Sequence, residues 1–265
     1  MATGSFTNLA AQKYLDHIFG GNSKSSHSPY LAAFITTPSV NGPGSEPAGG
    51  GYNRVALNGT YFSDSTTGTI TQLLDITYPR ATANWGQIVG FGLFDSSVAG
   101  NCYVFWHAED VETILVRDRL IVLAGGLNHT FISGLYSNYL KNLILNDCYN
   151  ISPIPVFPTI YAAHYLTAPT ATAGGTEPTV GGYTRQAVAN SAVNFSPWSG
   201  GEKLLSSDIL FPLATANQGT QTHFGWHDSQ TGGQFLAGGA LDVAKAIDLN
   251  DQFKFLAGEI THTLI

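Results

Sequence analysis

The sequence predicts a mostly β protein built of two tandem antiparallel β-sandwich domains, each with a short N-terminal helix. Three observations support this fold class. One series of motifs occurs twice in the same order, each copy opens with a helical pattern, and the rest of each copy consists of short strands separated by turn signals. Two copies are too few for a solenoid, so the repeat indicates a duplicated globular domain. We place the domains at residues 1–132 and 133–265.

The repeat is visible in segment pairs that keep one offset, which shifts by two residues midway along the copy. The pairs are Tyr30–Pro38 with Tyr161–Pro169, Glu46–Pro47 with Glu177–Pro178, Gly51–Arg54 with Gly182–Arg185, Ile76–Asn84 with Ile209–Asn217, Gly90–Asp95 with His223–Asp228, and Asp118–Gly125 with Asp251–Gly258. The junction near residues 130–137 has no Pro/Ser-rich or charged linker. We therefore expect the two copies to pack on each other.

Each copy begins with a helix. In the first, Leu9, Tyr14, Leu15, Ile18 and Phe19 approximate a helical stripe, with Thr7 as the N-cap and Gly20 as the stop signal. In the second, an equivalent stripe follows Ser137 and consists of Tyr139, Leu140, Leu143 and Ile144.

Strands account for the remainder of each copy. Residues 30–35 are apolar on both faces, as in a buried strand. Residues 86–94 form a further strand, which ends at a turn cluster over 95–100. The last strand contains residues 120–123 in the first copy and 253–256 in the second. Turn signals every 8–12 residues favour a sandwich.

Composition excludes several classes of function. Only 11% of residues are charged, the net charge is -7 and no basic run occurs, so nucleic-acid binding is not expected. No apolar stretch is long enough to cross a membrane, and the N-terminus lacks the pattern of a secretion signal. We expect synthesis in a cytoplasm, reduced thiols at Cys102 and Cys148, and no cofactor or metal.

The Gly-Tyr-x-Arg motifs stand out because the chain has five arginines in all. A functional interpretation of Tyr52, Arg54, Tyr183 and Arg185 is contact with an anion or a sugar. The interpretation we favour is structural: each arginine pairs within its copy or across a subunit interface. Trp85 precedes a strand and joins these residues as a candidate interface or structural anchor.

Other polar residues have simpler interpretations than catalysis. His223 and His227 could share a strand face and hold a metal, but the first copy has Gly90 and Phe94 there, so packing is favoured. Asp95 and Asp228 are expected to cap turns rather than to act as catalytic carboxylates. Glu46 and Glu177 are expected to lie on loop surfaces. No residue argues for an enzyme.

The motif order resembles that of small bacteriophage virion proteins called tail fibre-like proteins. The residues that carry the resemblance are the Gly-Tyr-x-Arg segments, the Pro-x-Ala-Thr-Ala segments, the strand ending in Phe94-Asp95, and Ala257-Gly258 before a final short strand. It covers nearly the whole chain twice, although Trp85-Gly86 becomes Gln218-Gly219, and segments 63–72 and 103–117 match their counterparts poorly. The resemblance implies a structural virion protein, in a tail fibre or as a capsid decoration protein, that is made in the cytoplasm of a bacterial host. It brings no catalytic residues.

Assembly with other virion proteins and with copies of itself is the expected activity. We expect a homotrimer, since three chains would offer six similar domains to a three-fold or six-fold partner. The alternative is a carbohydrate-binding adsorption module. A sugar-binding protein should expose aromatic rings, whereas a structural subunit should bury them; the four candidates are Trp85, Trp106, Trp198 and Trp226.

Overall fold

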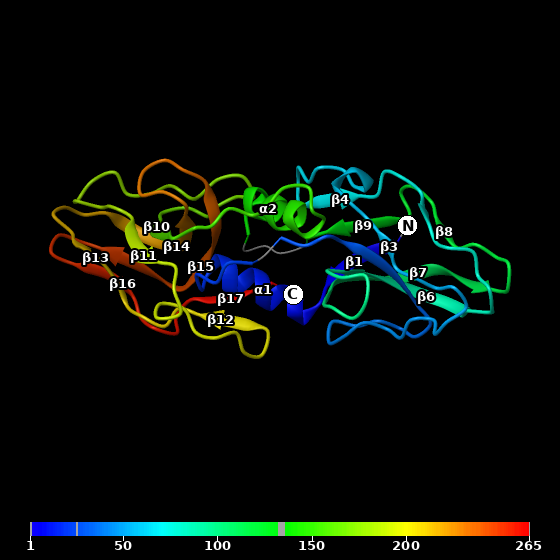
Figure 1. The fold of residues 1–265 in the computed structure, drawn as a ribbon. Coiled ribbons are helices and arrows are strands. Elements are labelled where there is room, and N and C mark those ends of the chain that lie inside the picture. Colours follow the sequence, from blue (N-terminus) through cyan, green and yellow to red (C-terminus); the bar gives the residue numbers. More distant parts are fainter. Residues whose placement is uncertain (1, 25, 132–135, 265) are drawn as a thin grey trace.

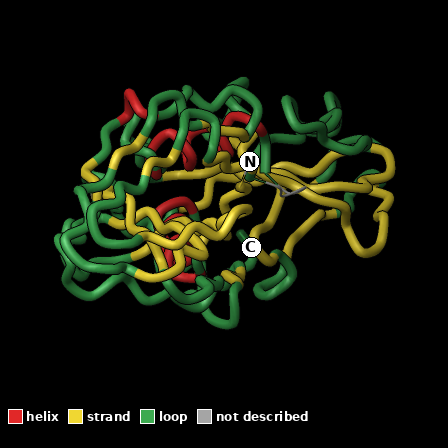
Figure 2. The backbone as a smooth tube through the Cα atoms, turned by 90° about the vertical axis from the view of Figure 1, so that its right-hand side faces the viewer, coloured by secondary structure: helices red, strands yellow, loops and turns green. Residues whose placement is uncertain are grey.

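The computed structural model describes residues 2–24, 26–131 and 136–264. The first repeat contains β1 (Ala2–Phe6), α1 (Asn8–Ile18), β2 (Tyr30–Phe34), β3 (Val55–Ala56), a 3-10 turn (Gly59–Tyr61), β4 (Thr69–Thr71), β5 (Ile76–Thr77), β6 (Gly86–Phe94), β7 (Cys102–Ile114), β8 (Ile121–Val122) and β9 (Leu127–Thr130). The second contains α2 (Asn138–Cys148), β10 (Thr159–Tyr165), β11 (Gln186–Ala189), β12 (Glu202–Leu204), β13 (Ile209–Leu213), β14 (Gly219–His227), β15 (Phe235–Ile247), β16 (Gln252–Phe255) and β17 (Thr261–Thr263). Strands and loops dominate the backbone (Figure 2), which confirms the mostly β fold class.

The two repeats share one strand order. In the first repeat the main sheet runs β3-β2-β6-β7-β1-β9-β4, and in the second the matching strands form β11-β10-β14-β15 and the separate pair β12-β17. A two-stranded ribbon accompanies each main sheet, β5 with β8 and β13 with β16. Segments 63–72 and 103–117, which match poorly in sequence, contain β4 and most of β7, and their counterparts form β12 and β15.

Both helices begin where the sequence predicts. The Thr7 hydroxyl accepts a hydrogen bond from the backbone N–H of Ala10, and the Ser137 hydroxyl accepts one from Leu140. Each side chain therefore satisfies one of the backbone donors that a helix leaves unpaired at its N-terminus. α1 ends at Ile18, just before the predicted stop at Gly20.

One strand pairing departs from the antiparallel arrangement that the sequence predicts. β1, which the sequence patterns did not indicate, pairs with β7 in antiparallel orientation and with β9 in parallel orientation. It inserts between two strands that come about 100 and 125 residues later in the chain. A parallel partner so distant leaves no local sequence signal, because no hairpin turn joins the two strands.

The two helices lie between the repeats, near the middle of an elongated molecule (Figure 1). One continuous core of buried side chains extends through both repeats and includes residues of both helices. The copies thus pack on each other, as the missing linker predicts. The domain boundary expected at 132/133 falls in residues 132–135 and lies outside the described residues. In the described part of the chain, no helix is long and apolar enough to cross a membrane.

Candidate functional site

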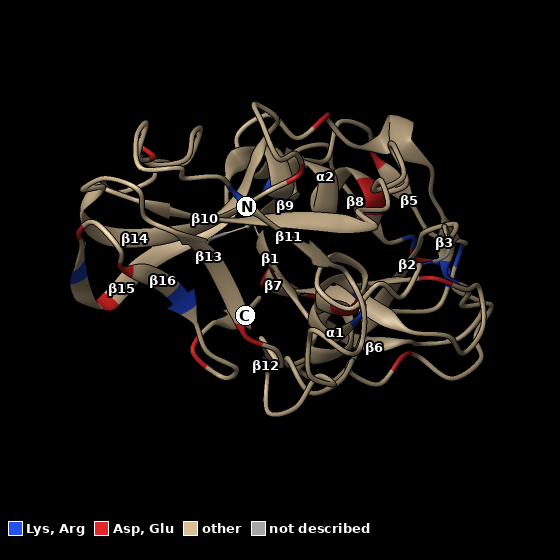
Figure 3. Ribbon diagram, turned by 90° about the vertical axis from the view of Figure 1, so that its left-hand side faces the viewer, with Lys and Arg blue, Asp and Glu red and all other residues tan. Residues whose placement is uncertain are grey.

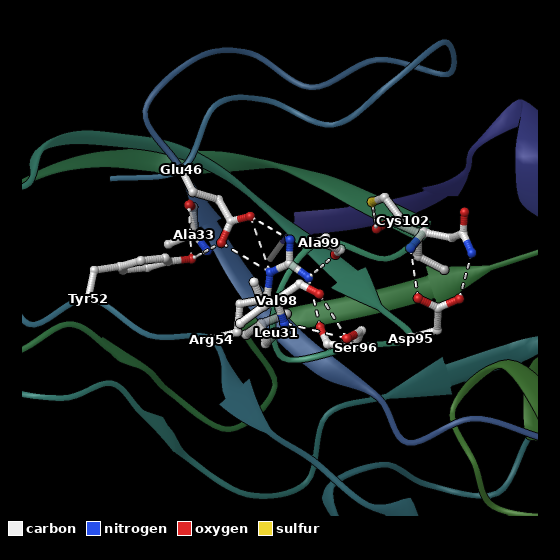
Figure 4. Close-up of polar contacts among 12 residues, drawn as sticks. Leu31, Ala33, Glu46, Tyr52, Arg54, Asp95, Ser96, Val98, Ala99 and Cys102 are labelled. Atoms are coloured by element: carbon white, nitrogen blue, oxygen red, sulfur yellow. Dashed lines mark hydrogen bonds and ion pairs between the residues drawn. The ribbon is translucent and has the colours of Figure 1, made fainter. Parts of the chain in front are cut away.

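The Gly-Tyr-x-Arg motif forms a polar cluster in each repeat, and Figure 4 shows the cluster of repeat 1. In repeat 1, the Arg54 guanidinium donates to both Glu46 carboxylate oxygens, at 2.6–3.1 Å, through Nε and Nη2. Its Nη1 donates to the carbonyl oxygens of Ser96 and Ala99 at 2.7 and 2.6 Å. The Tyr52 hydroxyl donates to Glu46 at 2.8 Å. We call Glu46, Tyr52 and Arg54, with Glu177, Tyr183 and Arg185 of repeat 2, the Glu–Tyr–Arg clusters.

The repeat 2 cluster has the same geometry. Arg185 contacts Glu177 at 2.6 Å and donates to the carbonyls of Ser229 and Gly232, and the Tyr183 hydroxyl donates to Glu177 at 2.7 Å. Burial by itself raises the pKa of Glu177, but hydrogen bonds from Arg185 and Tyr183 outweigh it, and the net pKa is lowered. Each arginine uses Nε, Nη1 and Nη2 inside its own repeat. This disfavours the alternative in which they bind a sugar or an external anion.

Glu46 and Glu177 lie in loops, as expected, but their side chains are not free on the surface. Their side chains are 24% and 22% exposed and each receives a bidentate arginine. The Glu-Pro and Gly-Tyr-x-Arg motifs therefore form one unit. The eight-residue spacing from glutamate to arginine, identical in both copies, was the sequence signal that could have revealed the pair.

The turn next to each cluster is built as the sequence predicts. Asp95 accepts hydrogen bonds from the backbone and side-chain amides of Asn101, at 2.7 and 2.8 Å, and Asp228 accepts one from the backbone of Gln234. Gly100 has φ +74°, and a Cβ atom there would collide with the Asp95 carboxylate. This turn supplies the two carbonyls that bind Arg54, so both aspartates have a structural role.

Trp85 and its counterpart Gln218 make the same contact with different chemistry. The indole N–H of Trp85 donates to the Gly50 carbonyl at 2.8 Å, and the Gln218 side-chain amide donates to the equivalent Gly181 carbonyl at 2.9 Å. Trp85 is 4% exposed and its ring packs edge-on against Tyr52. It lies beside the Glu–Tyr–Arg cluster of repeat 1, inside the fold.

His223 and His227, the two candidate metal ligands, contact different partners. The Nε2 atom of His227 lies 2.6 Å from the Tyr165 hydroxyl, while the Nδ1 atom of His223 lies beside the Thr222 hydroxyl. Burial, and then the charge of Arg185, lower the pKa of His227 to about 4, so the ring is neutral beside the arginine at pH 7. No group of three or more metal-ligating side chains occurs among the described residues. Cys102 and Cys148 are free and buried.

The sequence patterns missed a second set of residues, which joins the repeats. Lys24 of repeat 1 and Asp147 of repeat 2 form an ion pair of 2.7 Å with both side chains at most 5% exposed. The Tyr14 hydroxyl donates to the same carboxylate at 2.8 Å. A second pair joins Asp16 to Lys203 at 2.6 Å. These groups come from opposite repeats, so no local spacing could have indicated them.

Aromatic residues at the helix ends are exchanged between the repeats. Phe19, at the end of α1, stacks on His262 of repeat 2 with ring centroids 3.7 Å apart and contacts Phe195. Tyr149, at the end of α2, approaches His129 of repeat 1 through its hydroxyl at 3.1 Å and contacts Phe62. His262 and Phe195 are the counterparts of His129 and Phe62. Each repeat therefore completes its core with the helix end of the other.

The family model of the podophage GP4 fiber I protein gp80 matches residues 5–130 and, separately, residues 135–263. The chain belongs to this phage fibre family. The two matches coincide with the two repeats that share one strand order, and the tail fibre-like resemblance is confirmed in two copies. No curated protein sequence matches the chain.

For this gp80-family chain, tryptophan burial separates the two expected roles. Trp85, Trp106 and Trp226 are 0–4% exposed and belong to the core. Trp198 is half-buried and lines a cavity between the repeats. Three of the four rings therefore behave as in a structural subunit, and Trp198 is the exception.

Proposed function

We propose that this chain is a rigid fibre subunit of a phage particle that acts by protein–protein assembly, as a homotrimer that contacts other virion proteins. The observation that carries the proposal is the match of a phage fibre family to both halves of the chain. The proposal assigns the chain no catalytic step. Its Glu–Tyr–Arg clusters hold loops in place. The end of each helix packs into the opposite repeat, so the two repeats share one core.

The surface supports a role in assembly. Lys and Arg number 11 and Asp and Glu 18 in 265 residues, and charged positions are sparse over the ribbon (Figure 3). A weakly charged surface reduces the desolvation cost of burying it against another subunit. Equivalent positions in the two repeats also expose apolar side chains: Val116 and Leu249 are 50% and 59% exposed, and Leu123 and Leu256 are 65% and 37% exposed.

Two of these exposed apolar positions lie far from the two helices, toward opposite ends of the molecule. β8 lies toward one end of the molecule and β13 and β16 toward the other (Figure 1). Leu123 directly follows β8, and Leu256 directly follows β16. Duplicated exposed apolar residues at both ends would let each chain offer similar contacts at both ends, which is one way for identical subunits to join head to tail into a closed ring. Val98 and Val193 are also exposed, at 78% and 79%, but their counterparts Thr231 and Thr60 are polar.

The location and symmetry of the chain's density in an electron-microscopy map of whole particles test this proposal. We expect three-fold clusters on the fibre. Isolated single copies, or two-fold pairs without a three-fold contact, would end the homotrimer proposal. Density on the capsid lattice would instead assign the capsid decoration role.

A paired set of variants tests the surface. We expect the Val116→Asp and Leu249→Asp double variant to fold but to lose incorporation into particles, because a buried carboxylate without a partner opposes the contact. Val98→Asp is the control, since Val98 is even more exposed, at 78%, and the duplication does not repeat it. Equal incorporation of the double variant and the control would contradict the proposed contact.

A further inference from the structure

Each helix packs against one loop of the opposite repeat, and the duplication relates the two junctions. α2 lies against loop 63–68 of repeat 1, and α1 lies against loop 196–201 of repeat 2. The loops have equal length and the same attachment. The Ser63 hydroxyl accepts a hydrogen bond from the backbone of Thr71, and the Ser196 hydroxyl accepts one from Leu204. The two junctions can therefore be compared position by position within one chain.

The junction in repeat 1 is closed. Asn142 of α2 accepts hydrogen bonds from the Ser65 hydroxyl at 2.9 Å and the Gly68 backbone at 2.8 Å, and its side-chain amide donates to the Thr66 carbonyl. Asn146, one turn later, accepts from the Ser65 backbone at 2.8 Å. Ser65 is 5% exposed. Four hydrogen bonds thus draw the loop onto the helix.

The junction in repeat 2 is open. Gln12, Asp16 and Trp198 occupy the positions of Asn142, Asn146 and Ser65. Asp16 is paired with Lys203, and no hydrogen bond joins Gln12 to the loop among the described residues. The larger Trp198 ring occupies the loop position where Ser65 bonds to α2, and its indole N–H has no acceptor within residues 2–24, 26–131 and 136–264. A cavity of about 200 Å³ remains between α1 and the loop.

We propose that this cavity binds a neutral saccharide. The half-buried Trp198 ring lines it and offers an aromatic surface of the kind that packs against the C–H groups of a sugar ring. Gln12 and Asn22 supply amide donors and acceptors, and Asp16 supplies carboxylate oxygens, which together match the paired donor and acceptor character of sugar hydroxyls.

The charge of the cavity favours a neutral ligand. The carboxylate of Asp16 and the ammonium of Lys203 neutralise each other at 2.6 Å, and the Lys203 side chain is only 3% exposed. An anion would have to compete with Asp16 for that ammonium group. This site is separate from the exposed apolar positions proposed for assembly, so binding and assembly can fail independently.

Titration of the 265-residue chain with neutral monosaccharides, followed by saturation-transfer NMR and calorimetry, tests the proposal. The probes are glucose, galactose, mannose, rhamnose and N-acetylglucosamine, with N-acetylneuraminic acid and inorganic sulfate as anionic probes. We expect at least one neutral sugar to bind one site per chain with a Kd of about millimolar, as is usual for one small polar ligand. We expect Trp198→Ala to weaken that binding by about tenfold or more, and Ser65→Ala, at the equivalent position of repeat 1, to leave it unchanged.

A second variant controls for loss of fold. Gln12→Asn, Asp16→Asn, Trp198→Ser and Lys203→Ile together introduce the residues that the closed junction has, since Ile70 is the counterpart of Lys203. We expect this protein to fold with an unchanged circular dichroism spectrum and to lose sugar binding. The proposal is overturned by failure of every neutral probe to bind, by binding that survives the fourfold change, or by anionic probes binding where the neutral sugars do not. Particle incorporation is measured separately, so a failure here leaves the assembly proposal standing.

Discussion

At the scale of single residues, the Glu–Tyr–Arg clusters show why arginine recurs in both repeats. Arg54 contacts two carboxylate oxygens and two backbone carbonyls, and its guanidinium lies over the Phe94 ring at 3.5 Å. Lysine has one nitrogen and no planar fork, so it cannot make this set of contacts. The cluster holds together a glutamate loop, the Gly-Tyr-x-Arg segment and the turn after β6.

We expect Arg54→Lys to lower the free energy of unfolding by about 1–3 kcal/mol, because it leaves half-buried acceptors unpaired. Urea unfolding measures this. Arg119→Lys is the matched control, since Arg119 is exposed, and it should change stability by about 0.5 kcal/mol or less. Equal effects of the two substitutions would show that the cluster does not stabilise the fold.

Buried histidines should make the fold sensitive to acid. Burial lowers the pKa of His129 and His262 to about 3, while an unfolded histidine titrates near 6.5. The unfolded chain therefore binds more protons below pH 6.5, and the stability present above that pH is lost as the pH falls toward 3. The loss should be on the order of 1 kcal/mol per pH unit for each buried histidine.

Unfolding free energies measured between pH 7.5 and pH 4 check this expectation. The His262→Leu variant should show a shallower pH dependence than the unchanged protein. His107 is exposed, and His107→Gln should leave the slope as it is. A slope that is the same in all three proteins would rule out His262 as a source of acid sensitivity.

At the scale of elements, the helices belong to both repeats. Asn190 of repeat 2 donates hydrogen bonds to the carbonyls of His17 and Ile18, the last two residues of α1. These carbonyls are among those that a helix leaves unpaired at its C-terminus. Repeat 2 thus caps the C-terminus of α1 and also packs against the Phe19 ring that follows it.

We expect Phe19→Ala to destabilise the protein by about 3–5 kcal/mol, because it empties a buried site that the core cannot refill. Amide hydrogen exchange shows which repeat is destabilised. Although Phe19 belongs to repeat 1, exchange should accelerate in β17 of repeat 2, where His262 lies. Acceleration confined to repeat 1 would contradict the exchange of helix ends. Lys13→Ala serves as the control, because the Lys13 side chain is half-exposed and lies on the same helix.

At the scale of the whole molecule, the exchange joins two copies of one fold into one cooperative body. The core is continuous, a buried ion pair joins Lys24 to Asp147 across the repeats, and a partly buried one joins Asp16 to Lys203. Removing Lys24 or Asp147 would leave the other charge buried and unpaired, which is costly. Such contacts oppose separation of the repeats before unfolding.

We therefore expect one cooperative thermal transition for the full chain. Calorimetry should give equal calorimetric and van't Hoff enthalpies for a transition that involves all 265 residues. Substitutions in either repeat should shift that same transition. Two resolved transitions, each moved only by substitutions in its own half, would indicate independent domains.

The sequence by itself determined the features that depend on residues close together in the chain. The duplication, the caps at Thr7 and Ser137, the turns at Asp95 and Asp228 and the buried strand after residue 30 all follow from short-range patterns. Only the tertiary structure decided the parallel pairing of β1, the Glu–Arg pairs, the exchange of Phe19 and Tyr149, and the cavity beside Trp198. The physical reason is that these features join groups from distant segments, and their energies depend on burial and geometry that a local pattern does not contain.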